Sequence, residues 1–543
     1  MRRIILVAAM AVAVVSSALG TGASSGPRHV SVAAAVDLSA CAPPPDANHP
    51  FVLAVGSVKC QDVRDSADLL GPRIAVPFEY YVPADCAVSG VSCPVLYLLH
   101  GFGGDFTEML GTPGTMTSAW IQAETKRPPA GFEADPWNYA DPGTWSSDGV
   151  APLDMILVAP LGQTLADGWG PPGGGMDSYW VDWNPRYALK GDQQRYATPA
   201  PRFASFVTQE LPAFVDRYLP AIGGRSGQAI AGVSLGGYGS YDLGLQHPDD
   251  YAVMESVSGA MNFLFAPAPQ PGMVTLPPGV QPPVSVTYER LPAATGAVSG
   301  LPLPSQIGTF TTALDAFGDP VADQAYFRGN MPTDLAMNGR AYGASGDQLL
   351  GIDGFVNDMV PEQAVTGDPA ALQNDLSSEP FENIVFPMNL EMELAFVQQQ
   401  VHNRFAVHQG NHTDVYRNAW FRGLEEYAYA RLAHGPVSAP PVVPATFDYR
   451  SISTNFSIWG WQFVVDRQPV EFLTLRGVRC DGLTLQGTGT VQVTVPDACH
   501  TGLGGLATFS VDLGNSYPVD DPAALGALPF YGHVVTVHLT PLP

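Results

Sequence analysis

Short, continuous apolar runs mark the first four fifths of the chain, and each of them leads into glycine-rich or turn-forming sequence. The clearest are residues 94–99, 155–160 and 228–232. Runs that are apolar at every position are typical of strands buried on both faces of a parallel sheet. Between the second and third runs, residues 203–219 carry phenylalanine, leucine and tyrosine at helical spacing. Strand, helix and strand in this order predict a mostly parallel sheet with crossover helices.

Two proline-rich segments interrupt the pattern. Residues 263–304 contain runs such as Pro-Pro-Gly-Val-Gln-Pro-Pro, which fit neither a helix interior nor a central strand. An insertion of this length is either a lid or binding loop, or a disordered segment, and the sequence leaves both open. Residues 436–446 are also proline-rich and are typical of a semi-rigid linker.

Beyond the linker, β-forming residues alternate with polar ones between turns, as in Thr490-Val-Gln-Val-Thr-Val495. This alternation predicts an all-β sandwich over residues 447–543. A chain of 543 residues also exceeds the roughly 250–300 residues at which a single core stops growing. We therefore expect an α/β catalytic domain over residues 37–435, followed by the β-sandwich domain.

The N-terminus combines two arginines, a short apolar run over residues 4–15 and a tail of small residues. This order predicts a secretory signal peptide and small-residue leader over residues 1–36. The apolar run is shorter than the roughly 20 residues that span a bilayer, so no integral membrane association is expected. Secretion is the predicted localisation.

Charge and cysteine content narrow the chemistry. The chain carries 51 acidic against 25 basic residues, a net charge of −26, which disfavours nucleic acid as a partner. Its six cysteines suit disulfides in an exported protein, and we expect the sequential pairing. The predicted pairs are Cys41 with Cys60, Cys86 with Cys93, and Cys480 with Cys499. No metal-ligand spacing is apparent, and neither a metal nor a cofactor is expected.

The strongest chemical signal is Gly232-Val-Ser-Leu-Gly236, which follows a predicted strand and precedes a helix-compatible stretch. G-x-S-x-G in this setting predicts a nucleophile elbow, in which a sharp turn lifts the Ser234 hydroxyl above the sheet. A serine nucleophile also needs donors for the developing oxyanion. Residues 100–104, His-Gly-Phe-Gly-Gly, follow another predicted strand. We expect the amides of Phe102 and Leu235 to be those donors.

The base should follow the nucleophile in the chain, after the acid. Four histidines are candidates, at positions 402, 408, 412 and 434. His412 lies between an apolar stretch and the helical pattern of residues 416–432, where a loop after the last strand is expected. We therefore predict His412 as the general base, with His408 at a strand end.

Several segments together resemble the esterase D and mycolyltransferase group of α/β-hydrolases. They include residues 95–102, 177–185, 232–237 and 409–412, and the resemblance is specific at 232–237 and 409–412 and loose elsewhere. Residues 318–320, 340–346 and 381–389 are similar to late strands of that group. The resemblance covers most of residues 75–430 but not the C-terminal region. It implies an α/β-hydrolase fold, and it implies Glu382 as the acid that orients His412. The residue pattern alone does not favour Glu382 over Asp347, Asp353, Asp358 or Glu391.

Two departures from the mycolyltransferases bear on the substrate. Those enzymes have an acidic residue where this chain has His100, and a tryptophan where it has Asp414. Both differences favour ester hydrolysis over transfer to trehalose. We place His100, Trp180 and Trp183 at the substrate-binding region, although the aromatic cluster around Trp180 fits core packing equally well.

The resulting expectation is a secreted serine carboxylesterase that forms an acyl-enzyme on Ser234 with an acyl-ester substrate. Two alternatives remain open at this point. One is an acyltransferase of mycolyltransferase type, in which a sugar or lipid hydroxyl replaces water. The other is a non-catalytic cell-envelope binding protein on the same fold. The C-terminal domain is left as a carbohydrate or cell-envelope contact, a wall of the cleft, or a spacer.

Overall fold

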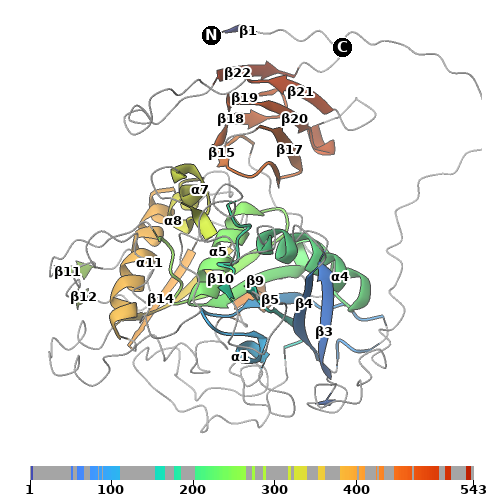
Figure 1. The fold of residues 1–543 in the computed structure, drawn as a ribbon, viewed down its shortest axis with the longest axis vertical. Helices are drawn as coiled ribbons and strands as arrows, with labels where there is room; N and C mark the ends of the chain where they lie inside the picture. The colour runs from blue at the N-terminus through green and yellow to red at the C-terminus, as the bar shows by residue number, and fades with distance from the viewer. Residues whose placement is uncertain are drawn as a thin grey trace, which may run out of the picture.

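The computed structural model describes the following parts of the chain: residues 2–3, 51–52, 58–66, 74–83, 85–88, 90–110, 153–164, 176–184, 202–263, 272–275, 285–288, 316–318, 323–338, 353–360, 379–399, 401, 403–409, 424, 427–432, 445–467, 470–499, 508–514 and 533–539. The predicted signal peptide, apart from Arg2–Arg3, lies outside these residues. Figure 1 shows the layers: a central sheet flanked by helices, with a separate group of strands from the C-terminal region above them.

A nine-stranded mixed sheet forms the centre of the α/β part, which precedes residue 436, in the order β14-β13-β10-β9-β5-β6-β4-β3-β2. The strands are β2 (Phe51–Val52), β3 (Val58–Ser66), β4 (Ile74–Val82), β5 (Val95–Leu99), β6 (Ile156–Pro160), β9 (Gln228–Val233), β10 (Val253–Val257), β13 (Asp353–Val360) and β14 (Asn403–Gln409). From β14 to β6 every pairing is parallel, and β4, β3 and β2 add an antiparallel edge. The three predicted strands are therefore the middle of the sheet.

The apolar runs are explained by burial on both faces. Along β5, Val95, Tyr97 and Leu99 join one hydrophobic cluster, while Leu96 and Leu98 join a second one on the other face. Because side chains alternate across a strand, a strand covered on both sides needs an apolar residue at every position.

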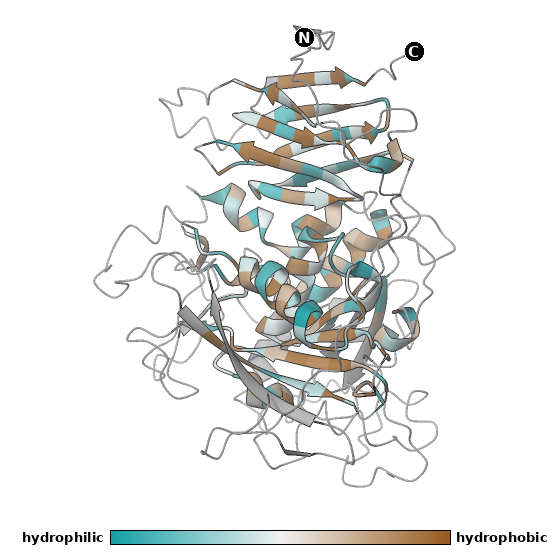
Figure 2. Cartoon of the chain, turned by 90° about the vertical axis from the view of Figure 1, so that its right-hand side faces the viewer, coloured by the Kyte–Doolittle hydropathy of each residue, from teal (hydrophilic) through white to brown (hydrophobic). Residues whose placement is uncertain are grey.

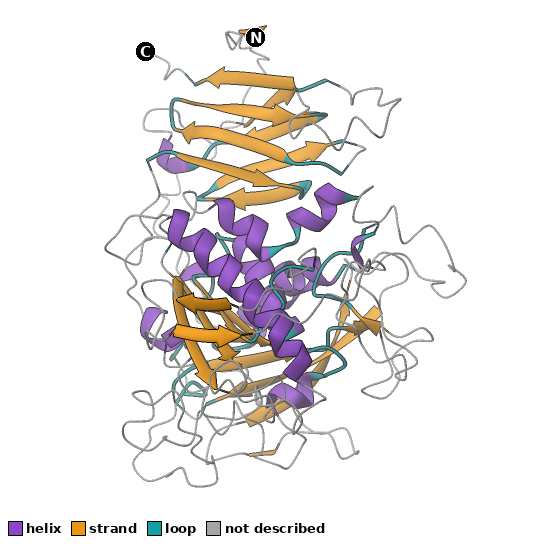
Figure 3. Ribbon diagram, turned by 90° about the vertical axis from the view of Figure 1, so that its left-hand side faces the viewer, coloured by secondary structure: helices purple, strands orange, loops and turns teal. Residues whose placement is uncertain are grey.

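Helices cover the sheet as the spacing of apolar residues predicts (Figure 3). They are α1 (Phe106–Leu110), α3 (Phe203–Ser205), α4 (Leu211–Tyr218), α5 (Leu235–Gln246), α7 (Gln324–Gly329), α8 (Pro332–Leu335) and α11 (Glu379–Gln399), with a π-helical turn at Phe206–Glu210 and a 3-10 turn at Arg225–Gly227. The helix predicted over residues 203–219 thus forms with a π-helical turn inside it. In α5 every residue before Gln246 is buried.

One expectation about the late strands is wrong. Residues 381–389, which resemble a strand in sequence, form the first half of helix α11. Ile384, Val385 and the proline at position 387 disfavour a helix locally. Residues 390–399 are rich in leucine, methionine, glutamate and glutamine, which favour a helix, and the helix extends back across the unfavourable segment.

The C-terminal region forms two antiparallel sheets. One has the order β22-β19-β18-β15, with β1 (Arg2–Arg3) beside β22, and the other has the order β16-β17-β20-β21. The strands are β15 (Phe447–Ser451), β16 (Asn455–Ile458), β17 (Trp461–Asp466), β18 (Leu473–Arg479), β19 (Gly482–Gly487), β20 (Thr490–Thr494), β21 (Thr508–Asp512) and β22 (His533–His538). Buried and exposed residues alternate strictly along β17, and Figure 2 shows apolar and polar positions interleaved along these strands.

These C-terminal sheets, called the β-module below, contact the α/β part at the C-terminal end of α5. The Tyr449 hydroxyl donates to the carbonyl of Leu245 at 3.2 Å. The carboxylate of Asp249 accepts hydrogen bonds from the amides of Trp459 at 2.6 Å and Gly460 at 3.0 Å. A helix end carries carbonyls without intrahelical partners, and the β-module satisfies one of them. The β-module is therefore docked, not held away as a spacer.

Two of the three predicted disulfides are confirmed, Cys86–Cys93 and Cys480–Cys499. Cys41 lies outside the described residues, so its pairing with Cys60 stays a prediction. Within the insertion at residues 263–304, β11 (Gly272–Thr275) and β12 (Ser285–Tyr288) form an antiparallel hairpin. A second short pair joins β7 (Gln163–Thr164) to β8 (Met176–Asp177). Of the helices described, none has the length and apolarity needed to cross a bilayer.

Candidate active site

Ser234 occupies the turn between β9 and α5, as the motif predicts. Its backbone has φ 55° and ψ −117°, a conformation that residues other than glycine rarely adopt. Its amide donates to the carbonyl of Val257 at 2.8 Å, which ties the turn to the neighbouring strand β10. The side chain is 7% exposed. A strained turn held by hydrogen bonds at a strand end is the geometry of a nucleophile elbow.

The two motif glycines are required by close backbone approach. A Cβ atom on Gly232 would collide with the carbonyl of Gly236, and one on Gly236 would collide with the carbonyl of Leu99. The second contact brings the first turn of α5 against the end of β5. Because the loop at residues 100–104 starts there, the elbow and this loop lie side by side.

The glycine-rich loop at residues 100–104 is held from several directions. The amide of Gly101 donates to the Glu108 carboxylate at 3.3 Å, and the Gln163 side-chain amide donates to the carbonyl of Gly104 at 2.6 Å. Gly103 has φ 71°, which glycine adopts without strain. Phe102 is half-buried within this loop. Leu235 is the first residue of α5, where amides have no partner within the helix. The two predicted oxyanion donors thus belong to adjoining segments.

His100 is a buried, neutral residue beneath the loop. The amide of Gly162 donates to its Nε2 at 2.8 Å, so the proton is on Nδ1, which lies 2.8 Å from the carbonyl of Gly101. Burial lowers the pKa of His100 to about 4, because the charged imidazolium would lose its hydration. Its ring contacts Trp180 edge to face, with ring centres 4.9 Å apart.

Trp180 and Trp183 are buried as well, at 1% and 3% exposure. The Trp180 indole donates to the carbonyl of His100 at 3.3 Å, and that of Trp183 donates to the carbonyl of Ser178 at 3.0 Å. Trp180 therefore supports the glycine-rich loop, and Trp183 supports the turn at residues 178–184. Tyr179 belongs to this turn, and its ring contacts the ring of Phe102 in the glycine-rich loop, with 6.2 Å between the ring centres. It also contacts the ring of Phe263, with 5.4 Å between the ring centres.

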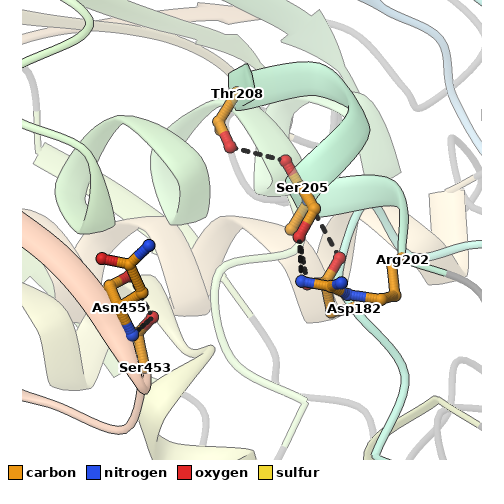
Figure 4. Close-up of polar contacts among 7 residues, drawn as sticks. Asp182, Arg202, Ser205, Thr208, Ser453 and Asn455 are labelled. Carbon is orange, nitrogen blue, oxygen red and sulfur yellow. Dashed lines mark hydrogen bonds and ion pairs between the residues drawn. The ribbon is translucent and has the colours of Figure 1, made fainter. Parts of the chain in front are cut away.

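The turn at residues 178–184 is fixed to the start of α3 by Asp182. This carboxylate accepts hydrogen bonds from the Ser205 amide at 2.9 Å and from the Ser205 hydroxyl at 2.6 Å. Figure 4 shows Arg202 beside the same carboxylate, and its Nε lies 3.4 Å away. Asp182 therefore anchors the segment that supports the glycine-rich loop.

Backbone strain concentrates around Ser234. Among the described residues other than glycine, positive φ occurs at five positions: Tyr179, Trp180, Ser234, Ser258 and Trp459. Ser234 belongs to the elbow, and Ser258 follows β10 beside it. Tyr179 and Trp180 belong to the turn at residues 178–184, which supports the glycine-rich loop. Strained backbone persists only where the surroundings enforce it, and it clusters at functional sites.

Neither side chain of the predicted base and acid is among those that the structure describes. β14 ends at Gln409, three positions before His412 in the sequence, and His412 itself lies outside the described residues. Glu382 is in the first turn of α11, and its side chain also lies outside them. A crossover helix runs back along the sheet, so the N-terminus of α11 lies at the same carboxyl edge as Ser234. Both assignments stay predictions.

A protein-family model matches the part of the chain that contains the elbow. Residues 170–296, which include Ser234, match the family model named Esterase and described as "Putative esterase". The resemblance to this family is thereby confirmed for that part of the chain. A search of curated protein sequences gave no match.

Similar solved structures include an S-formylglutathione hydrolase from Agrobacterium tumefaciens, with 15% identity, 71% of this chain and 98% of the other covered, and a TM-score of 0.41. A ferulic acid esterase has 16% identity, covers 70% and 100%, and has a TM-score of 0.39. Mycobacterium tuberculosis MPT51 (FbpC1) has 14% identity, covers 68% and 99%, and has a TM-score of 0.36.

Some supporting residues have no signal in the sequence. Glu108, Gln163 and Asp182 are ordinary polar residues whose partners are backbone groups or residues distant in the chain. Only the spacing of Glu108, four residues after Gly104, connects it with the glycine-rich loop. No group of three metal-binding side chains occurs among the residues that the structure describes.

Proposed function

We propose that this protein is a serine ester hydrolase that works through an acyl-enzyme on Ser234. The observation that carries the proposal is the strained turn at Ser234, packed directly against the end of β5 where the glycine-rich loop begins. The match of residues 170–296 to an esterase family model supports the same class of reaction.

In the proposed mechanism the Ser234 Oγ attacks the ester carbonyl while His412 takes its proton. The amides of Phe102 and Leu235 donate to the oxygen of the tetrahedral intermediate. His412 then protonates the leaving alcohol, and the acyl group stays on Ser234. A water molecule, deprotonated by His412, then attacks the acyl carbon, and the bond to Ser234 Oγ breaks as His412 returns the proton to that oxygen and the acid leaves. Glu382 holds the imidazole orientation and stabilises its charged form. The proposal needs no metal or cofactor.

We further propose that the protein is exported, and its two confirmed disulfides support this. The two C-terminal sheets are inferred to form a sandwich domain, because the inward residues of β17 and β18 belong to one hydrophobic cluster. The catalytic domain would then end near residue 435, with the linker at 436–446. The described rings of Tyr449, Trp459 and Trp461 are buried, so they offer no surface for stacking a sugar.

A product analysis tests the proposal. The full chain and its Ser234→Ala variant are incubated with esters of graded acyl length, with and without a sugar acceptor, and the products are measured by mass spectrometry. Free acid from the natural chain alone, unaffected by the acceptor, is the expected result. Acylated sugar would identify an acyltransferase instead. No product, together with no labelling by a serine-directed phosphonate, would favour a binding protein.

The acid is tested by exchanging each of two carboxylates for its amide. Glu382→Gln is expected to lower kcat by about 10- to 10³-fold, less than loss of Ser234 or His412, because the amide still fills the space but no longer stabilises the charged imidazole. Glu391→Gln, in the same helix, is the control and should retain wild-type kcat. The reverse outcome would assign the acid to Glu391 and remove Glu382 from the triad.

A further inference from the structure

Helix α11 contacts the segment that follows β10, on the side away from β9. Asn389, which is fully buried, donates from Nδ2 to the carbonyl of Gly259 at 2.6 Å. The same Nδ2 donates to the carbonyl of Val385, one turn back in the helix, at 3.0 Å. A second polar contact runs from Asn262 to Glu391 at 3.3 Å.

Gly259 in turn lies against the first turn of the nucleophile helix. A Cβ atom on Gly237 would approach the Cα of Gly259 to 3.0 Å, and one on Gly259 would approach the carbonyl carbon of Gly237 to 2.8 Å. The preceding residue, Ser258, has φ 51°, and Val257 before it accepts the amide of Ser234. The strained turn after β10 and the strained elbow therefore support each other directly.

The burial of Asn389 is energetically unfavourable for one of its two polar atoms. Its Oδ1 is enclosed and has no hydrogen-bond partner within the described part of the chain. Leaving a buried polar atom unpaired destabilises the folded protein. A leucine of similar shape would avoid that cost and fill the same space. Stability alone therefore does not account for an asparagine at this position, whereas the bond to Gly259 does if the turn must be held in place.

We propose that Asn389 is a positioning residue for the reaction, which fixes the turn at Ser258 and Gly259 and through it the elbow that carries Ser234. This inference rests on the proposed function. It assigns Asn389 no contact with substrate. Its role is to keep the Ser234 hydroxyl in register with the glycine-rich loop at residues 100–104.

The test compares Asn389→Leu with Asn338→Leu in the full chain. Asn338 is a matched control because it is also buried and makes two hydrogen bonds, both to the backbone of Arg450 at the interface with the β-module. Asn389→Leu is expected to lower kcat by about 10- to 100-fold with KM little changed, since small misplacements of reacting groups have effects of this size. The rate of phosphonate labelling at Ser234 should fall in parallel. Asn338→Leu should lower Tm at least as much and leave kcat unchanged.

A wild-type kcat in folded Asn389→Leu would overturn the inference while leaving the proposed function intact. Absence of labelling in the natural chain would instead overturn both. If Asn389→Leu fails to fold, Asn389→Asp replaces it. A buried carboxyl has a raised pKa, and its protonated form is able to donate to Gly259. At pH 6, where the carboxyl is protonated, the kcat of that variant should approach that of the natural chain, and a kcat that stays low at pH 6 would contradict the inference.

Discussion

Turnover by the Ser234→Ala variant is expected to fall by a factor on the order of 10³–10⁶, with the fold unchanged. The hydroxyl is the group that forms the acyl-enzyme in the proposed mechanism, and alanine removes it without adding bulk to the strained turn. His412→Ala should have an effect of the same size. Because the two residues act in one step, the double variant should be no slower than the slower single variant.

The measurement is kcat/KM on the best ester found in the product analysis, together with phosphonate labelling. Ser453→Ala is a suitable control, since Ser453 lies in the β-module and its hydroxyl bonds to the backbone of Asn455, two residues away. Ester turnover that survives Ser234→Ala would place the nucleophile elsewhere. Full labelling of Ser234 in the His412→Ala variant would remove His412 as the base.

Gly236→Ala should damage both folding and catalysis. The added Cβ would collide with the Leu99 carbonyl, a backbone atom that cannot move aside without shifting β5 or α5. Overpacking in a closed core costs about 1–3 kcal/mol or more, and the collision falls between the elbow and the glycine-rich loop. We expect a lower Tm and a loss in kcat/KM of at least about 100-fold.

Gly244→Ala is the matched control in the same helix. A Cβ there would meet the Cβ of Met254 at 3.0 Å and its Sδ at 3.2 Å, a tight contact with a side chain but with no backbone atom, and alanine is favoured over glycine in a helix by roughly 0.5–1 kcal/mol. This variant should keep its activity and lose little stability. The measurements are Tm from thermal unfolding and kcat/KM for ester hydrolysis, on both variants. Equal Tm and equal kcat/KM in the two variants would show that the close approach at Gly236 does not matter.

The sequence alone was informative where a local pattern has one physical explanation. Apolar runs without alternation predict doubly covered strands, and β5, β6 and β9 follow. The glycines at 232 and 236 predict a tight turn because no other residue fits beside the carbonyls they approach. The cysteine pairs close in sequence predict short disulfide loops, and Cys86–Cys93 is one of them.

Other features depend on contacts that no local pattern records. Bulky aromatic residues such as Tyr179 and Trp180 give no sign of positive φ, which only their packing enforces. The start of α11 resembled a strand because helix formation there depends on the residues that follow. The docking of the β-module was unpredictable because Asp249 binds backbone amides some 210 residues further along the chain.

That docking has a geometric consequence. The β-module is fixed to the end of α5 at Leu245 and Asp249, whereas Ser234 is at the opposite end of this helix. Twelve helical residues span about 18 Å. This helix therefore sets the distance and the orientation between the β-module and Ser234. Anything bound to the β-module would be held at a fixed distance and angle from the Ser234 hydroxyl.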